Sequence, residues 1–409
     1  MKSLLCFISV FIFSPQSYSQ AEIKTMFYNV LNFASAPPDD RLQSLNTILS
    51  SYEPDLFMVC EVESQKDASD ILNYGFQYTS ASMKQSPFLF NTSGASLIHQ
   101  VVYYDNEKFT LEATHQIKTN VRSINHYTFE LKTNSKVKLE VFVAHFKASR
   151  GFSNENERTF EAQQFIDYIS KFPPETNILL AGDFNMYSSA ETAYQTLLNG
   201  TNALDLIDPI DSPGNWNSNS SYANIHTQST RVSNSEFDDY GAGGGLDDRF
   251  DIILMSDAID TKRNSIGYID NSYKAWGNNG NCFNNAISNN DCAGLYSSQL
   301  RQALYRTSDH LPVVAEFSID EPFLATKHST DDNLLLFTQG NVIKHQLELE
   351  LAPELKSRKV NIFNALGKEM CSFTILSENE QIDMSGVADG LYFLKVEGIH
   401  TPFKFLVVK

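Results

Sequence analysis

The sequence predicts an α/β sandwich with a buried sheet core, followed by a small β-sandwich at the C-terminus. Runs of β-branched and aromatic residues recur through most of the chain, and amphipathic helical patterns lie between them. After Phe323 the pattern changes to short strands separated by turn residues. The chain has 409 residues, of which 42% are hydrophobic, so its length and composition suit two or three ordinary globular domains.

The N-terminus has the order of a secretory signal peptide. Lys2 precedes an apolar run over residues 4–13, and Pro15 and the small residues around Ser17 follow it. The run is too short to span a bilayer. We therefore expect residues 1–20 to be removed, with cleavage near Ser19 or Gln20, and no stable insertion of the mature protein in a membrane. The alternative is a buried N-terminal helix.

The sequence of residues 21–324 predicts the α/β domain. Its pattern predicts seven strands, at residues 23–33, 55–63, 99–105, 138–146, 177–184, 249–256 and 311–317. Helical spacing of apolar residues predicts helices at 39–51 and 154–172. Strands that alternate with helices favour a sheet core covered by helices. The polar stretch Gly214–Gly245 predicts a long surface loop.

The sequence of the C-terminal part predicts a separate module. Residues 325–333 have the polar composition of a linker. Residues 334–409 hold short strand patterns such as "HQLELEL" and "GLYFLKVEG", with turn signals between them. This length and pattern indicate a small β-sandwich.

The chain is acidic, with a formal net charge of −18, and almost all of this excess lies in the region 21–325. Such acidity argues against unassisted binding to nucleic acid. It suits a site that gathers divalent cations, and it equally suits plain solubility outside the cell. Export permits disulfides. We expect one between Cys282 and Cys292, because the loop that they bracket has little apolar surface. Cys60 and Cys371 are expected to be thiols.

Polar side chains stand at the ends of the predicted strands. They are Asn29, Glu61, His145, Asp183 and Asn185, and a further cluster, Ser308-Asp309-His310, opens the last predicted strand. Each of them alone has an ordinary structural interpretation. Together, carboxylate and amide oxygens suit a hard cation such as Mg²⁺. Histidines beside such a metal suit proton transfer near neutral pH.

The order of these motifs resembles the endonuclease/exonuclease/phosphatase superfamily, which includes DNase I-like nucleases, sphingomyelinases and inositol-polyphosphate phosphatases. The matching pieces are "YNVLNF", "PDLFMVCEVE", "FVAHFKAS", "LLAGDFN", "RFDIILMS" and "TSDHLPVVAEF", between Ile23 and Phe317. The resemblance implies a four-layer sandwich of two mixed β-sheets flanked by helices. It places the active site at one end of the sandwich.

The resemblance also implies roles. Asn29, Glu61 and Asp309 would hold or adjoin a divalent metal, Mg²⁺ first, with Mn²⁺ or Ca²⁺ as alternatives. His310, oriented by Asp251, would activate water or stabilise the phosphate, and His145 would serve the leaving oxygen. Asp183 and Asn185 would position the nucleophile and the phosphate. Lys147 and Arg150 could contact a phosphate or could form a solvated face. Where some members of the family pair the second histidine with a glutamate, this chain has His99-Gln100, so His145 lacks an acidic partner.

The tail resembles the C-terminal sorting domain of type IX secretion cargo, through "KVNIFNALGKEM", "IDMSGVADGLYFLKVEG" and the ending "FKFLVVK". That resemblance implies contact with the secretion machinery and a secreted or cell-surface location. Taken together, the sequence predicts a monomeric, metal-dependent phosphodiester hydrolase, an extracellular endonuclease acting on DNA or RNA. The alternatives are a phospholipid or small phosphoester hydrolase and, in another class, a non-catalytic surface adhesin on the same fold.

Overall fold

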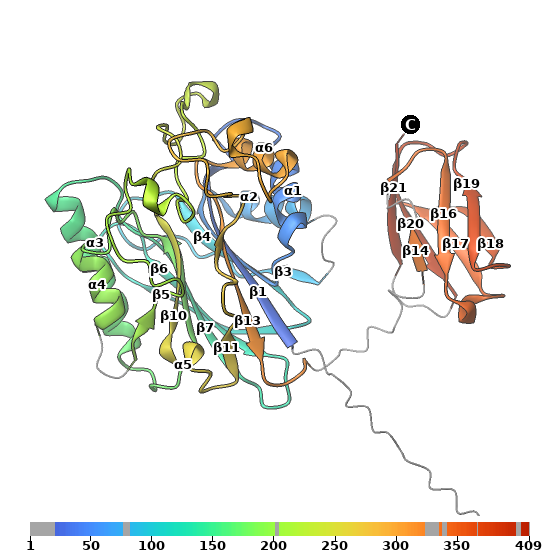
Figure 1. Ribbon diagram of the computed structural model, residues 1–409. Coiled ribbons are helices and arrows are strands. Elements are labelled where there is room, and N and C mark those ends of the chain that lie inside the picture. The colour runs from blue at the N-terminus through green and yellow to red at the C-terminus, as the bar shows by residue number, and fades with distance from the viewer. Residues whose placement is uncertain are drawn as a thin grey trace, which may run out of the picture. The chain divides into compact units, whose positions relative to one another are not determined.

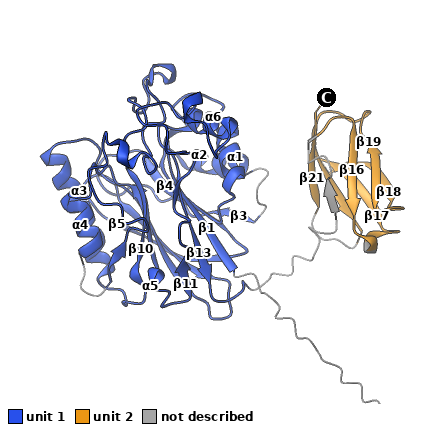
Figure 2. Ribbon diagram, viewed as in Figure 1, with its two compact units in different colours: residues 1–324 blue, residues 325–409 orange. Residues whose placement is uncertain are grey.

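The computed structural model divides the chain into two compact units, residues 1–324 and 325–409 (Figure 2). It describes residues 21–76, 82–200, 204–323, 335–337, 342–365, 367–397 and 402–408. The expected signal peptide and linker lie outside the described residues.

Unit 1 is built on two mixed β-sheets, as expected (Figure 1). The first has the order β11 (Ile266–Tyr268), β13 (Val313–Ile319), β1 (Ala21–Phe33), β2 (Leu56–Val62), β4 (His99–Asp105) and β3 (Met83–Gln85), and β12 (Lys274–Ala275) also pairs with β13. The second has the order β5 (Phe109–Ile117), β6 (Ile124–Leu131), β7 (Lys138–His145), β8 (Ile178–Asp183), β10 (Asp251–Ser256) and β9 (Leu206–Ile207).

Helices cover the outer faces of the two sheets. Figure 1 shows α3 (Phe152–Ile169) and α4 (Thr192–Asn199) along one side and α1 (Arg41–Tyr52) and α6 (Ser298–Thr307) on the other. The short helices α2 (Gln65–Asp70) and α5 (Asp257–Asp260) complete the unit. The four layers of the predicted sandwich are thus present.

Three apolar cores lie between these four layers. Alternation along β1 shows how the sequence builds them: Met26 and Tyr28 pack under α1 and α6, whereas Phe27 points into the core between the sheets. Phe142 and Leu180 of the second sheet pack against α3 and α4 in the third core. Because both sheets are buried on both faces, their central strands are apolar on both sides.

The strand directions bring particular strand ends to one end of unit 1, the upper end in Figure 1. β1 runs parallel to β2, and β7 runs parallel to β8. In the second sheet Asp183 pairs with His145 on one side and with Asp251 on the other. The polar residues that close or open these strands therefore lie at the same end.

The stretch 214–245 differs from the predicted surface loop. It has only the short 3₁₀ turns Ser220–Tyr222 and Ser235–Phe237, but most of its middle part, residues 225–231, is buried. The burial is possible because the backbone and side chains find partners there. The hydroxyl of Thr227, for example, accepts hydrogen bonds from the amides of Phe250 and Asp251.

Unit 2 is a small β-sandwich, as expected. One sheet has the order β14 (Leu335–Phe337), β16 (Gln346–Leu351) and β19 (Asn379–Asp383). The other has the order β15 (Val342–Ile343), β21 (Phe403–Val407), β20 (Gly390–Val396), β17 (Lys359–Asn364) and β18 (Glu369–Thr374). A core of its own, which includes Leu347, Ile362 and Leu394, stabilises the unit.

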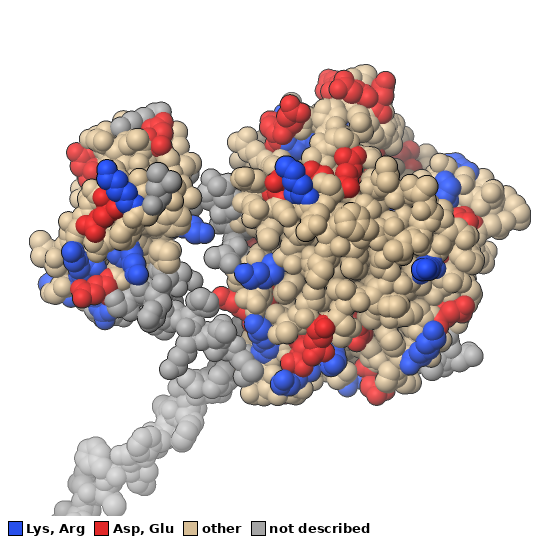
Figure 3. Space-filling view, turned by 180° about the vertical axis from the view of Figure 1, so that it is seen from behind, with Lys and Arg blue, Asp and Glu red and all other residues tan. Residues whose placement is uncertain are grey.

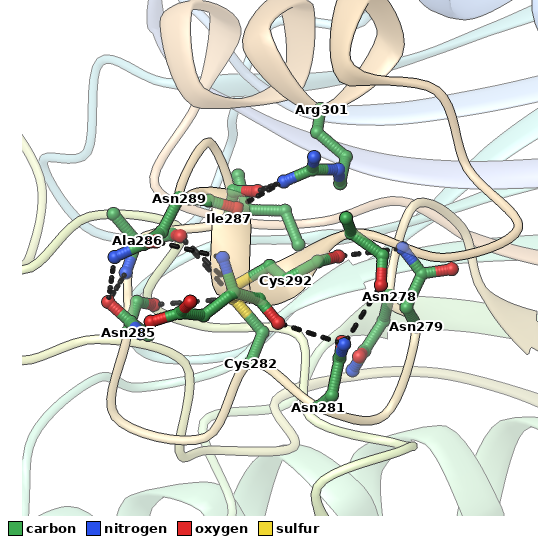
Figure 4. Close-up of a disulfide and its surroundings, with 12 residues drawn as sticks. Asn278, Asn279, Asn281, Cys282, Asn285, Ala286, Ile287, Asn289, Cys292 and Arg301 are labelled. Carbon is green, nitrogen blue, oxygen red and sulfur yellow. Dashed lines mark hydrogen bonds between the residues drawn. A yellow bond between two sulfur atoms is a disulfide. The ribbon is translucent and has the colours of Figure 1, made fainter.

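The structure contains the disulfide between Cys282 and Cys292 that the sequence predicts (Figure 4). The bond closes a loop in which asparagine amides bind backbone carbonyl groups, as Asn279 does with the carbonyl of Cys292. Arg301 of α6 donates to the carbonyls of Ile287 and Asn289 in the same loop. Cys60 is a buried thiol and Cys371 is a half-buried one.

Removing the disulfide should destabilise unit 1. We expect Cys282→Ala together with Cys292→Ala to lower the free energy of unfolding by about 2–3 kcal/mol, because a short closed loop is freed in the unfolded chain. Thermal unfolding of the purified protein measures the effect. Cys371→Ala is the control and should leave the unit 1 transition unchanged. Equal midpoints for the double variant and the wild type would contradict the prediction.

Candidate active site

The candidate site lies near the ends of six strands of the two sheets. Asn29 is in β1, Glu61 is in β2, and His145 and Asp183 are the last residues of β7 and β8. Asp251 is the first residue of β10. His310 comes shortly before β13. The pairing of β2 with both of its neighbours shifts register beside Glu61, so the site sits at an irregularity of the sheet.

The backbone at several of these positions is in the left-handed region. Glu61 has φ 66°, Asn185 has φ 52°, and Leu31 and Asn32 have φ 47° and 39°. Non-glycine residues in this region cost about 1–3 kcal/mol each, and such strain gathers at functional sites. Here the backbone amide of Asn32 donates to Glu61 Oε2 over 2.9 Å, which helps to fix the Glu61 carboxylate.

Asn29, Glu61, Asp183 and the two histidines form one cluster. Asn29 Nδ2 donates to Glu61 Oε1 and to Asp183 Oδ2, each over 2.9 Å. Asp183 Oδ2 lies 3.6 Å from Nε2 of His145 and 3.7 Å from Nε2 of His310. Glu61 Oε1 lies 3.9 Å from His145 Nε2. The Asp183 carboxylate is thus the centre of the cluster.

Asp183 is almost completely buried, and its carboxyl is easy to protonate. Burial raises the pKa of Asp183 to about 7, with His310 opposing the rise and Asp251 adding to it. A carboxyl with a pKa near neutrality can both hold and release a proton at physiological pH.

His310 is oriented from both of its ring nitrogens. Its Nδ1 lies 2.7 Å from Asp251 Oδ2, and its Nε2 lies 2.7 Å from Gln228 Nε2. The Gln228 amide nitrogen can only donate, so this contact uses the lone pair of the neutral imidazole. Protonation of His310 would require the Gln228 amide to turn.

The charges around His310 favour that protonation. Burial opposes the imidazolium, but the carboxylates of Asp251, Asp309 and Asp183 together outweigh it and hold the pKa of His310 well above its ordinary value. His310 therefore combines a high proton affinity with a fixed orientation, which are the properties of a proton-transfer group.

His145 has the opposite character. Burial, then the charges of Arg122 and His310, lower the pKa of His145 well below its ordinary value. Its Nδ1 has no hydrogen-bond partner among the described residues. The side chain of Gln100 donates to the carbonyl of Ser123 instead. Among the described residues no carboxylate therefore pairs with Nδ1 of His145, and its low pKa favours the neutral imidazole.

Two groups of side chains have the spacing of metal ligands. Glu61, His145 and Asp183 form one, and Asp183, Asp251 and His310 form the other. Asp309, which the sequence resemblance placed beside the metal, is in neither group. Its Oδ2 accepts hydrogen bonds from Gln228 Nε2 and from the amide of Ala242, over 3.0 and 2.7 Å. Its carboxylate thus faces the 228–242 segment rather than Glu61.

The remaining predicted residues lie around the cluster. The amide of Asn185 donates to Asp183 Oδ1, and its side chain donates to the carbonyl of Phe146. Lys147 Nζ donates to the carbonyl of Ala148. Arg150 is exposed, and its guanidinium carbon lies 4.2 Å from the centre of the Tyr187 ring.

Sequence reasoning missed two residues that shape the site. Gln228 contacts both Asp309 and His310. Arg122 donates to the carbonyls of His145 and Phe146, over 2.7 and 2.6 Å. Gln228 comes from an irregular polar stretch, and no periodicity distinguishes it from its neighbours. Arg122 precedes a strand, β6, that the sequence analysis did not predict.

The C-terminal part of the chain matches a known protein family. Residues 341–409 match the family described as "Secretion system C-terminal sorting domain". The predicted sorting domain is thereby confirmed, and it indicates type IX secretion to the cell surface or the extracellular space. No curated protein sequence matches the chain. None of the helices in the described part of the chain has the length and apolar character that a membrane span needs.

Several solved structures are similar to the chain. The human Nocturnin catalytic domain with bound sulfate anion is 15% identical, with a TM-score of 0.48 over 73% of this chain and 94% of that chain. D. rerio TDP2 complexed with single strand DNA product is 14% identical, with a TM-score of 0.49 over 73% and 99%. The endonuclease/exonuclease/phosphatase from Bacteroides vulgatus is 14% identical, with a TM-score of 0.47 over 74% and 100%. The family predicted from the motifs is thus found among the similar structures.

Proposed function

We propose that unit 1 is a metal-dependent phosphodiester hydrolase and that its substrate is extracellular DNA or RNA, cleaved endonucleolytically. The observation that carries the proposal is the convergence of Asn29, Glu61, His145, Asp183 and His310 from separate strands onto one buried cluster. A non-catalytic adhesin on this fold would have no use for buried acids and histidines in mutual contact, because burying unused polar groups costs stability.

In this proposal Asp183 and His310 together carry out the proton transfer. Water attacks the phosphorus in line, and its proton passes to the Asp183–His310 pair, whose groups are close enough to titrate together. The bond from phosphorus to the leaving oxygen breaks, and that oxygen takes a proton from solvent water. Asp251 holds the imidazole through Nδ1. The amide of Asn185, fixed by the carbonyl of Phe146, positions the phosphate or the water.

The residues fit a divalent cation at the Glu61 side of the cluster. The carboxylates of Glu61 and Asp183 converge there with Nε2 of His145, and the low pKa of His145 favours the neutral imidazole that a metal ligand needs. Glu61 and His145, with Asn29 and Asp183 beside them, would hold the ion. A bound Mg²⁺ or Mn²⁺ would neutralise charge on a phosphate oxygen. His145 thus fits a metal ligand better than the proton donor that the sequence resemblance implied.

The basic side chains of unit 1 favour a local contact with phosphate over a broad basic groove. On the face of unit 1 seen in Figure 3, uncharged residues cover a wide central area, and acidic and basic side chains are scattered around it. Near the cluster, Arg150 offers an exposed guanidinium stacked on Tyr187. Burial raises the pKa of Asp248 to about 6, and the charges of Arg150 and His310 are among those that oppose this rise. We propose Arg150, more than Lys147, as the phosphate contact.

A substrate panel tests the proposal. The mature protein is incubated with supercoiled plasmid, RNA, sphingomyelin vesicles and bis(p-nitrophenyl) phosphate, with Mg²⁺ or Mn²⁺ and with EDTA. We expect plasmid and RNA cleavage with the metal and a loss of at least about 100-fold with EDTA, because the metal supplies several kcal/mol of charge stabilisation. Hydrolysis of no phosphodiester under any metal would overturn the proposal, and undiminished cleavage in EDTA would overturn its metal dependence.

Exposed apolar side chains favour a second candidate, a phospholipid phosphodiesterase. Phe90 and Leu97 are 62% and 80% exposed in the loop before β4, and Phe152 is 79% exposed at the start of α3. The loop lies beside the site, because His99, the first residue of β4, pairs with Val62 next to Glu61. Exposed apolar groups of this kind can meet a lipid surface. In the panel, hydrolysis of sphingomyelin without cleavage of plasmid or RNA would select this candidate.

A further inference from the structure

Two loops leave the centre of the site, one after His145 and one after Asp183. The first includes Lys147, Ser149 and Arg150, and the second runs through Asn185 and Tyr187 to α4. Neither loop belongs to a sheet, and the second makes only an isolated bridge between Ser188 and Asn215. Their relative position decides where the proposed phosphate contacts stand.

Three charged residues contact the backbone of these loops. Arg158 and Glu161 are fully buried in α3, and Glu191, which is partly buried, stands immediately before α4. Arg158 Nε donates to Glu191 Oε2 over 2.8 Å, and the two side chains form an ion pair at 2.7 Å. An ion pair in such a place needs further hydrogen bonds to offset its loss of water.

Those further bonds go to the two loops. Arg158 NH1 donates to the carbonyls of Lys147 and Ser149, over 3.0 and 2.9 Å. Glu191 Oε1 accepts the amide of Tyr187 over 2.8 Å. One ion pair therefore contacts the backbone of both loops at once.

Glu161 supports the first loop from the same helix. Its Oε2 accepts the amide of Lys147 over 2.8 Å. Burial raises the pKa of Glu161 to about 8, with that hydrogen bond opposing the rise, so this group adds little charge at neutral pH. Lys147 is thus held at its amide by Glu161 and at its carbonyl by Arg158.

We propose that Arg158 and Glu191 form a clamp that sets the position of the His145 loop relative to the Asp183 loop. Both are positioning residues, because Arg158 acts through the backbone of Lys147 and Ser149 and Glu191 acts through that of Tyr187. The geometry requires a guanidinium: its Nε and NH2 face Glu191 while NH1 reaches two carbonyls. A lysine ammonium lacks this planar fork. The inference rests on the proposed hydrolysis only for its kinetic readout.

The kinetic test compares Arg158→Met with Arg301→Met. Arg301 is also a buried arginine that donates to two loop carbonyls, but its loop carries the disulfide and no proposed site residue. We expect Arg158→Met to lower kcat on bis(p-nitrophenyl) phosphate by about 100-fold, because a displacement of about 1 Å can cost that much. KM should change less than about threefold, and Arg301→Met should retain kcat within about twofold.

A milder variant keeps the test decisive if Arg158→Met does not fold. Glu191→Gln preserves the shape of the side chain but removes its charge, and we expect about a tenfold loss of kcat. Arg158→Lys and Glu191→Gln are also combined in one chain. Because the two residues act as a unit, the double variant should lose no more kcat than the more damaging of these two substitutions does alone. The clamp would be overturned if the loss of kcat merely equalled the fraction of the variant that is unfolded. It would also be overturned if Arg301→Met lost as much kcat.

Hydrogen exchange supplies a readout that needs no substrate. We expect Glu191→Gln to speed amide exchange about tenfold in peptides covering both residues 146–151 and 184–190, although Glu191 itself bonds only the second loop. Faster exchange in the second loop alone would overturn the coupling. If the wild type hydrolysed no phosphodiester, this measurement would still decide the inference, and the failure would belong to the proposed function.

Discussion

Replacing His310 with glutamine should reduce kcat on a phosphodiester by about 10³-fold while leaving the fold intact. His310 is the only described side chain that is held at one ring nitrogen by a buried carboxylate, Asp251, and lies within 3.7 Å of Asp183 at the other. A positioned proton-transfer group contributes about 10²–10⁴-fold to a rate. Glutamine keeps much of the volume of the side chain but cannot transfer a proton.

His126 offers a matched control for this experiment. It is also buried, and its Nε2 lies 2.7 Å from Glu140 Oε2, but it is in the middle of β6 and contacts Phe142 and Tyr168 rather than the site. His126→Gln should lower the thermal midpoint and retain kcat within about twofold. Initial rates and circular dichroism on both variants decide the matter. Wild-type turnover by His310→Gln would remove His310 from the mechanism.

Asp251→Asn refines the same prediction. The amide can still meet His310 Nδ1, but it cannot stabilise an imidazolium and can hold the ring in the wrong tautomer. We expect kcat to fall by at least about 100-fold with little change in KM. A variant that lost only affinity would indicate that Asp251 shapes the pocket rather than the proton transfer.

The sequence predicts the strands of unit 1 well because their residues alternate between two cores. The predicted strand His99–Asp105 is found with the same bounds, and the helix predicted at 39–51 is observed at Arg41–Tyr52. The helix α6, Ser298–Thr307, was not predicted, although Ser297 caps it by accepting the amide of Leu300. The cap and the apolar Leu300, Ala303 and Leu304 were a usable signal.

The directions of the strands explain which site residues could be predicted to lie together. Glu61, His145 and Asp183 end strands whose directions are fixed by the sheet, so the fold brings them to one end. Asp309 shows the limit of that reasoning. It is adjacent to His310 in the sequence, and Gln228 Nε2 contacts both Asp309 Oδ2 and His310 Nε2. Alternation along an extended backbone would send neighbouring side chains to opposite sides, so it does not predict this shared contact.

Gln228 could not be predicted, because its role comes only from tertiary contacts. It belongs to a polar stretch that the sequence assigns to the surface, and the fold buries that stretch by pairing its backbone with that of His310. The buried charges Arg158 and Glu161 were likewise placed on a predicted helix, but nothing in their spacing revealed the loops that they hold. Local pattern locates elements, whereas these contacts depend on how distant elements pack.

Deleting residues 334–409 should stop export while leaving unit 1 folded and active. Unit 2 matches a secretion sorting domain over residues 341–409 and has a hydrophobic core of its own. Unit 1 has three hydrophobic cores of its own. We therefore expect the truncated chain to remain with the cells, and the purified unit 1 to keep its thermal midpoint and its kcat within about twofold.

A matched pair of substitutions separates the fold of the tail from its mere presence. Leu394 is fully buried in the core of unit 2, and its neighbour Lys395 is exposed. Leu394→Asp places an unpaired charge in that core, which costs several kcal/mol and should unfold the unit. Lys395→Asp introduces the same residue on the surface. Export should be lost with the first change and kept with the second, as immunoblots of medium, cell surface and cell extract would reveal. Because the sorting signal is expected to be a folded β-sandwich, equal export of the two variants would mean that a linear segment is recognised instead.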